Sequence, residues 1–72
     1  MKTKFAICTN NQDYPASLER WKVYQILEDE KDEKRGLIRI IDESGEGYLY
    51  SAKDFTAIEL PKEVENQMLA LL

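Results

Sequence analysis

The segment that decides the fold is Glu43–Leu60, with the sequence ESGEGYLYSAKDFTAIEL. Its glycines and small polar residues predict a hairpin turn, because such residues accept the backbone angles of tight turns. Tyr48–Ser51 is then expected to run antiparallel to the preceding strand. Ala52–Phe55 fits a single helical turn, and Thr56–Leu60 predicts a short final strand. The residues expected to anchor this segment in the core are Leu49, Phe55, Ile58 and Leu60.

Three more strands are predicted upstream of this segment. Leu37–Asp42, LIRIID, contains three isoleucines, whose β-branched side chains pack well on a pleated sheet. Lys22–Glu28 is rich in apolar residues and is too short for an amphipathic helix, so it also predicts a strand. Lys4–Thr9 alternates Phe5 and Ile7 with smaller residues, which predicts a strand with these two side chains in the core.

Two polar connections separate these strands. Asn10–Ser17, NNQDYPAS, is a cluster of turn-forming residues and predicts a long irregular loop. Glu28–Arg35, EDEKDEKR, contains eight consecutive ionisable residues. We interpret this run as a solvated hairpin loop, with an acidic docking surface for a basic partner as the alternative. Its acidic residues are Glu28, Asp29, Glu30, Asp32 and Glu33.

The last twelve residues, PKEVENQMLALL, predict an amphipathic helix that begins at Pro61. Glu63 and Glu65 in its first turn complement the helix dipole. A helix this short is marginal in water, so it is expected to dock on the strands of its own chain. The alternatives are pairing with a second copy in a homodimer and docking on a different partner. The apolar face comprises Val64, Met68, Leu71 and Leu72.

Length and composition favour one small folded domain. A chain of 72 residues buries only about 60% of the surface of its unfolded form. Hydrophobic residues make up 43% and charged residues 33%, which is typical of globular proteins. The net charge of −4 disfavours direct binding of nucleic acid, and the basic residues are dispersed. The N-terminal segment lacks a signal-peptide pattern, and no segment approaches the roughly 18 apolar residues of a membrane span, so we expect no membrane association and a cytoplasmic location.

The sequence offers no candidate catalytic, cofactor-binding or metal-binding residue, so we expect a protein that is not an enzyme. It contains no histidine, no glycine-rich phosphate loop and no cluster with metal-ligand spacing. The acidic residues gather in segments expected to be wet, where no cleft would raise a carboxyl pKa. Cys8 is the single cysteine and is expected to be a half-buried reduced thiol, with a redox or metal role as the alternative.

The order of these parts resembles the Src-homology-3-like barrel over Phe5–Leu60. SLERWKVYQILED is similar to the end of that fold's long first loop and its second strand, and GEGYLYSAKDFTAIE to its fourth strand, helical turn and fifth strand. Small one-domain bacterial and phage proteins, generally uncharacterised, have a similar SL-x-x-G-K-x-Y and DESGE-x-YLY arrangement. In this chain Arg20 and Trp21 stand where a small turn residue and glycine are expected.

The resemblance implies a mostly β fold, a small five-stranded antiparallel barrel at residues 1–60 with a short helix at 61–72. Its peptide-binding members hold proline-rich ligands between aromatic side chains. This chain has Leu37 where the third strand of those members opens with tryptophan, and Tyr50 where they have proline. Phe55 stands near an expected tyrosine. Only Tyr14 and Tyr50 remain as slot aromatics, so recognition of proline-rich peptides is disfavoured.

Trp21 is the single tryptophan and allows two interpretations. It could cap the open end of the barrel, with its indole N–H bonded to a loop carbonyl. It could instead be an exposed contact residue, because a turn that needs a small residue has little buried space for an indole.

The function that these features favour is a non-enzymatic protein-interaction module that binds a protein partner or itself. The contacts are expected from Trp21, Tyr14 and Tyr50 and from the apolar face of the C-terminal helix. The alternative is an acidic inhibitor or regulator that imitates nucleic-acid charge on a basic partner protein. In that case the five acidic residues of the charged run would serve as phosphate surrogates, and binding would weaken with salt.

Overall fold

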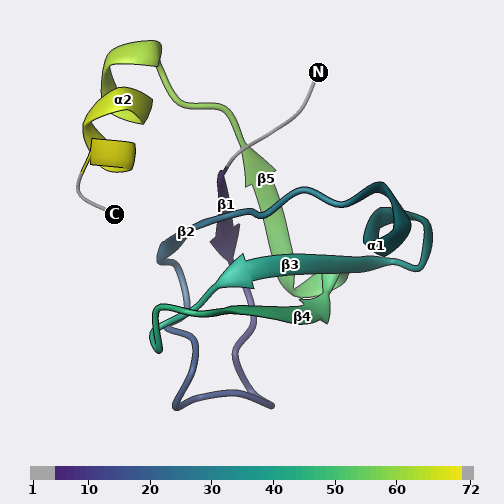
Figure 1. The fold of residues 1–72 in the computed structure, drawn as a ribbon. Helices are drawn as coiled ribbons and strands as arrows, with labels where there is room; N and C mark the ends of the chain where they lie inside the picture. Colours follow the sequence, from purple (N-terminus) through teal and green to yellow (C-terminus); the bar gives the residue numbers. More distant parts are fainter. Residues whose placement is uncertain (1–4, 71–72) are drawn as a thin grey trace.

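The computed structural model describes residues 5–70 and contains two small antiparallel sheets and a C-terminal helix (Figure 1). One sheet has the strand order β2-β1-β5, and the other pairs β3 with β4. The strands are β1 (Phe5–Cys8), β2 (Val23–Gln25), β3 (Leu37–Ile41), β4 (Gly47–Ser51) and β5 (Phe55–Ile58). The helices are α1 (Glu30–Lys34), the 3-10 turn η1 (Ala52–Asp54) and α2 (Lys62–Ala70).

The predicted hairpin, helical turn and five antiparallel strands are confirmed. β3 and β4 pair from Leu37 opposite Ser51 to Ile41 opposite Gly47. Gly45 has a φ of 84°, a left-handed conformation that glycine adopts without steric cost. The 3-10 turn η1 leads directly into β5, which pairs with β1 along its whole length.

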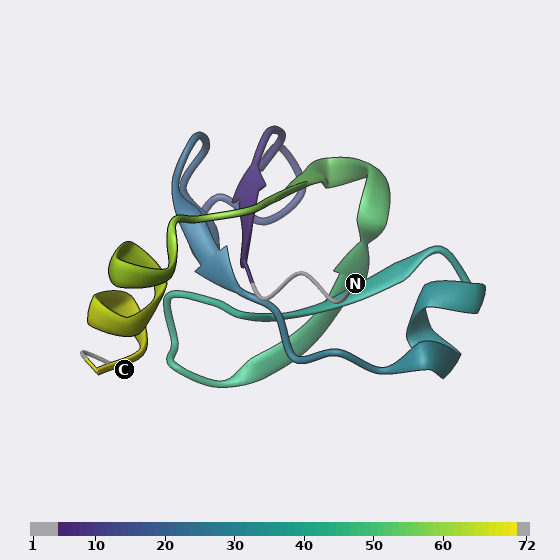
Figure 2. The ribbon, with the colours of Figure 1, turned by 90° about the horizontal axis from the view of Figure 1, so that it is seen from above.

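The two sheets meet at one corner and do not form a closed barrel. Past the end of β2, an isolated bridge joins Ile26 to Ile40 of β3. Beside it, the Leu27 N–H donates to the Arg39 carbonyl at 2.9 Å. Within residues 5–70, no strand pairing joins β4 to β5. The strands of the two sheets therefore run across one another, as Figures 1 and 2 show.

The core lies between the two sheets. The prediction for β1 is correct for Phe5, which is buried, but Ile7 is only half-buried. Ala6 and Cys8, on the opposite face of the strand, are buried as well and belong to the central cluster, which Phe5 does not join. The prediction assumed that the larger side chains of β1 face the core. Because β1 buries residues on both of its faces, side-chain size does not indicate which face packs against the second sheet. The cluster consists of Ala6, Cys8, Leu18, Tyr24, Ile40, Tyr50 and Phe55.

Of the four anchors expected in the final segment, only Phe55 is buried. Leu49, Ile58 and Leu60 are half-buried. Their place in the core is taken by Tyr50, which the sequence had suggested as a partner contact. Strand alternation explains this outcome, because Tyr50 lies opposite Ile38 on the face of the hairpin that looks toward the other sheet.

A buried polar group makes the burial of Tyr50 possible. The Tyr50 hydroxyl donates to Oδ2 of Asp42 at 2.5 Å, and Oδ1 of Asp42 accepts from the Ser44 N–H and hydroxyl. Burial alone would raise the pKa of Asp42, but these hydrogen bonds together hold it below its ordinary value of 3.8. Burial, together with the bond to Asp42, raises the pKa of Tyr50 to about 12.

The charged run forms the helix α1, which corrects the expectation of a solvated loop. The Asp29 carboxylate caps its start by accepting from the Lys31 N–H at 2.9 Å, and acidic residues fill the first turn. Gly36, with a φ of 70°, follows the helix and leads into β3. Asp32 is buried at 5% exposure, so one predicted surface residue is not on the surface.

Helix α2 stands beside the sheets at the end of an extended segment that follows β5 (Figures 1 and 2). None of its residues is buried. Leu71 and Leu72, which were expected to complete its apolar face, lie outside the described residues. In the part of the chain that the structure describes, no helix has the length and apolar character needed to cross a membrane.

The first prediction concerns the bond between Tyr50 and Asp42. Tyr50→Phe removes a donor from a buried carboxylate, so we expect the free energy of unfolding to fall by roughly 1–3 kcal/mol at neutral pH. Urea denaturation followed by circular dichroism measures this change. Tyr48→Phe is the matched control, because the exposed Tyr48 hydroxyl bonds only to Glu46 in the described structure and its loss should cost less than about 0.5 kcal/mol.

The same substitution should alter the response to acid. A carboxyl whose pKa is lowered by folding stabilises the protein above its unfolded-state pKa, and that stability is lost as the pH falls through the lower folded-state pKa. Tyr50→Phe removes one of the lowering bonds. Its stability should therefore fall less steeply than that of the wild type between about pH 5 and pH 3. Identical slopes for the two proteins would contradict this account.

Candidate interaction surface

Trp21 is the most exposed large hydrophobic residue of residues 5–70, at 60% exposure. It is also the one residue other than glycine in that range with a positive φ, 71°. The indole therefore does not cover the end of the sheets, and its exposure agrees with the second interpretation of Trp21. Its role as a contact residue stays a prediction. A φ of 71° lies in the left-handed region that glycine adopts most readily, and glycine was the residue expected at this position.

Hydrogen bonds hold the turn at Trp21 in this conformation. The Trp21 N–H donates to the Cys8 carbonyl at 2.6 Å, and the Lys22 carbonyl accepts from the Cys8 N–H at 2.9 Å. Arg20 donates from Nε to the Thr9 carbonyl and places its guanidinium 4.8 Å from the centre of the indole ring. A left-handed residue with a Cβ costs roughly 1–2 kcal/mol, so the surroundings impose this geometry on Trp21.

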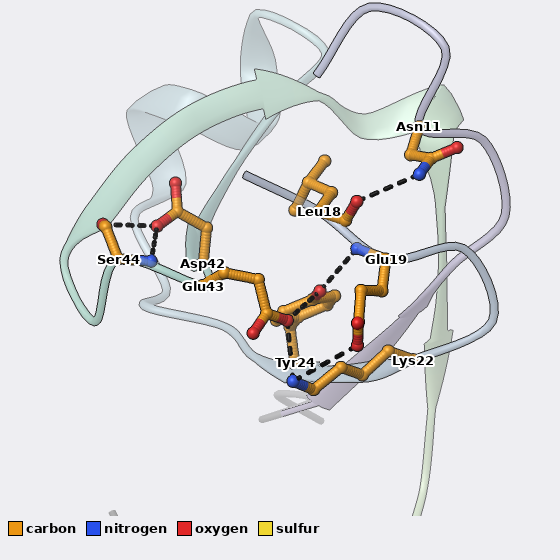
Figure 3. A network of polar contacts seen from close by, with 8 residues as sticks. All are labelled: Asn11, Leu18, Glu19, Lys22, Tyr24, Asp42, Glu43 and Ser44. Carbon is orange, nitrogen blue, oxygen red and sulfur yellow. Dashed lines mark hydrogen bonds and ion pairs between the residues drawn. The ribbon is translucent and has the colours of Figure 1, made fainter. Parts of the chain in front are cut away.

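A polar network ties this turn to the β3–β4 hairpin (Figure 3). The Tyr24 hydroxyl accepts from the Glu19 N–H at 2.7 Å and donates to the Glu43 carboxylate at 2.5 Å. Lys22 Nζ donates to the same Glu43 oxygen at 2.7 Å, and the bonds from Lys22 and Tyr24 lower the pKa of Glu43. The residues on both sides of Trp21 are thus held to the body of the protein.

Tyr14 and Tyr50 lie together, but they do not form an open aromatic slot. Their rings meet edge to face with centroids 5.0 Å apart. Tyr14 is 46% exposed, whereas Tyr50 is buried and is not available as a contact residue, contrary to the prediction. Together they help to line a depression of about 350 Å³. Tyr48 lines the same depression and is exposed; its position two residues before Tyr50 on one strand could have indicated it.

The acidic residues of the charged run do not form one exposed surface. Asp32 is buried beside Arg39, with its Oδ2 3.4 Å from the arginine Nε. Asp29 uses its carboxylate as the cap of α1. Glu30 and Glu33 are exposed, as is Glu28. All five residues also line a cavity of about 460 Å³, whose other lining residues are mostly apolar.

The predicted contacts lie on separate parts of the molecule. Trp21 is on the connection between β1 and β2, and it lines neither of the two cavities. Val64 is 40% exposed on α2, and Met68 on the same helix is half-buried. The structure brings together only Tyr14 and Tyr50 from the aromatic set, and the acidic residues around α1.

Residues 5–70 contain neither a group of metal-ligating side chains nor an exposed thiol. Among residues 5–70, no three histidine, cysteine, aspartate or glutamate side chains are placed to hold a metal ion. Cys8 is fully buried, not half-buried as expected, and carries a free thiol that donates to the Asn10 carbonyl at 3.4 Å. Burial raises the pKa of Cys8, which disfavours the reactive thiolate.

The chain matches no protein-family model, no curated protein and no solved structure.

The second prediction concerns the strain at Trp21. Trp21→Gly should be at least as stable as the wild type, because glycine adopts a φ of 71° without a Cβ clash. Trp21→Ala loses the stacking with Arg20 as Trp21→Gly does, but it keeps the Cβ, so it should be less stable than Trp21→Gly by about 0.5–1 kcal/mol. Thermal and urea unfolding of the three proteins give this order. An alanine variant more stable than the glycine variant would show that the turn is not strained.

Proposed function

We propose that this protein is a non-enzymatic interaction module that binds a protein partner through the turn at Trp21. The module is a small Src-homology-3-like domain of the kind found in small bacterial and phage proteins. Its partner would meet Trp21 and the stacked Arg20, with Tyr14 on the same connection between β1 and β2 as a further contact.

Three features support the Src-homology-3-like assignment. Through the bridge between Ile26 and Ile40, the five strands follow one another in the order β5-β1-β2-β3-β4. The single 3-10 turn η1 lies between β4 and β5, where the resemblance implies a short helical turn. The long connection between β1 and β2 corresponds to the long first loop of that fold.

The observation that carries the proposed function is the exposed indole on strained backbone. Glycine would relieve the conformational cost at this position, and an indole at 60% exposure recovers little from burial in the isolated protein. Tryptophan and arginine are the residues most enriched at the energetic centres of protein interfaces. A partner that covers the indole would offset the strain, which gives a reason for tryptophan in this turn.

The third prediction tests this function by affinity capture from native lysate. The wild type should retain a specific set of proteins, and Trp21→Gly should lose them while remaining folded. Loss of an interface tryptophan typically costs 2 kcal/mol or more, so retention should fall at least about tenfold. Trp21→Phe keeps an aromatic side chain and should retain part of the binding. Equal yields of the same proteins with the wild type and Trp21→Gly would refute the role of Trp21.

Self-association is the second form of the same proposal. The apolar face of α2, with Val64 and Met68, is not buried in the described structure and could pair with its copy. Sedimentation at high protein concentration separates the two forms. If the wild type is a dimer and Val64→Glu is a monomer, the dimer contact involves α2. If the wild type is a monomer, self-association is excluded and binding of a different protein is the form of the proposal that stays.

An acidic regulator that imitates nucleic-acid charge is the alternative function. It is supported by the exposed Glu28, Glu30 and Glu33 around α1, but no longer by Asp32, which is buried. Captured proteins that remain bound to Trp21→Gly and dissociate as salt is raised would favour this alternative.

A further inference from the structure

A cavity of about 460 Å³ lies beside the core. It extends from α1 and the start of β3 to η1 and β5. Ala57 on β5 lines the cavity. It lies on the same face of the strand as Phe55, but Phe55 is buried and Ala57 is exposed. The cavity is thus an opening beside the core, bounded by apolar side chains. These are Ile26, Leu27, Leu37, Ile38, Ala52 and Ala57.

Asp32 places a carboxylate with unused hydrogen-bonding capacity among the residues that line this cavity. The residue is 5% exposed, and its Oδ2 has no hydrogen-bond partner within residues 5–70. The ion pair with Arg39 Nε, at 3.4 Å, compensates charge without supplying a hydrogen bond. Buried carboxylate oxygens are normally hydrogen-bonded, so a donor from a ligand would satisfy this one. Because Oδ2 is closed to solvent, the ligand reaches it when a neighbouring side chain moves aside.

The charge of the lining gives the chemistry of that ligand. Five of the residues that line the cavity are acidic, whereas Arg39 is the one basic residue in the lining. Glu30 and Glu33 are exposed on α1 at the edge of the cavity. A ligand that brings lysine or arginine to this edge and an apolar side chain to the interior would match both parts of the lining.

We propose that this cavity binds a basic amphipathic peptide segment of a partner protein. An apolar side chain of the segment packs against Ile38 and Ala57, and a neighbouring guanidinium or ammonium group donates to Asp32 and to the acidic edge. The cavity volume of about 460 Å³ suits one or two side chains and not a folded domain. This inference rests on the proposed interaction role, but it uses a surface separate from Trp21.

The fourth prediction tests the site with a capped hexapeptide of alternating arginine and leucine. Nitrogen-15 correlation spectra recorded during its addition should show shifts confined to residues 26–39, 52 and 57. A hexapeptide of alternating glutamate and leucine, at the same concentration, should cause none of them. Trp21→Gly should bind the basic peptide as the wild type does, so that failure of this site and failure of the Trp21 proposal are distinguished.

Two pairs of variants separate the cavity from general charge attraction. Ala57→Leu fills the cavity and should weaken binding at least about tenfold, whereas Thr56→Leu, on the opposite face of the same strand, should not change it. Glu30→Gln with Glu33→Gln should weaken binding roughly fivefold at low salt. Glu59→Gln with Glu63→Gln makes the same change of net charge away from the cavity and should have no effect.

The outcomes decide the proposal. Localised shifts that Ala57→Leu abolishes support the site. Shifts spread over the whole surface, equal losses in both charge variants, or equal binding of the acidic peptide would each overturn it. Absence of any shift at millimolar peptide would overturn it as well.

Discussion

The hydrogen bond between the Tyr50 hydroxyl and the Asp42 carboxylate is the interaction on which the rest of the structure depends. It allows a tyrosine to enter the core of a domain that has few large apolar side chains to bury. The Tyr50 ring then meets Phe55 and supports Tyr14. Its partner Asp42 also shapes the β3–β4 turn through Ser44. One buried carboxylate therefore connects the hairpin turn, the core and the first long connection.

The turn at Trp21 shows how such a small domain can present an aromatic side chain rigidly. Tyr24, itself part of the core, reaches the surface with its hydroxyl and bonds to both Glu19 and Glu43. These contacts hold the turn while the indole stays outside. A residue whose backbone is held in this way would lose little backbone freedom if a partner covered it, as we propose. The domain thus presents its largest exposed ring on backbone that its own core has positioned.

The two sheets do not close into a barrel, and a cavity is left beside the core, separate from the turn at Trp21. Within the described residues the sheets pair only at the bridge of Ile26 to Ile40, and apolar residues beside that bridge border a cavity. The short helix α1 then surrounds this opening with acidic side chains. The side chains of residues 5–70 do not fill this opening. The two candidate surfaces therefore differ in chemistry, one aromatic and cationic, the other apolar and acidic.

The sequence by itself determined the strands, the hairpin turn and the helical turn before β5, because glycines, turn residues and β-branched residues act through local backbone preferences. It also indicated the unusual position of Trp21, where the resemblance placed a glycine. Tertiary structure alone decided which faces are buried. Ala6 rather than Phe5 meets the central cluster, Tyr50 rather than Leu49 enters the core, and Asp32 leaves the surface. These outcomes depend on how the two sheets cross and on the hydrogen bond between the Tyr50 hydroxyl and the Asp42 carboxylate. Local sequence patterns do not reveal such contacts, because they depend on how separate elements pack together.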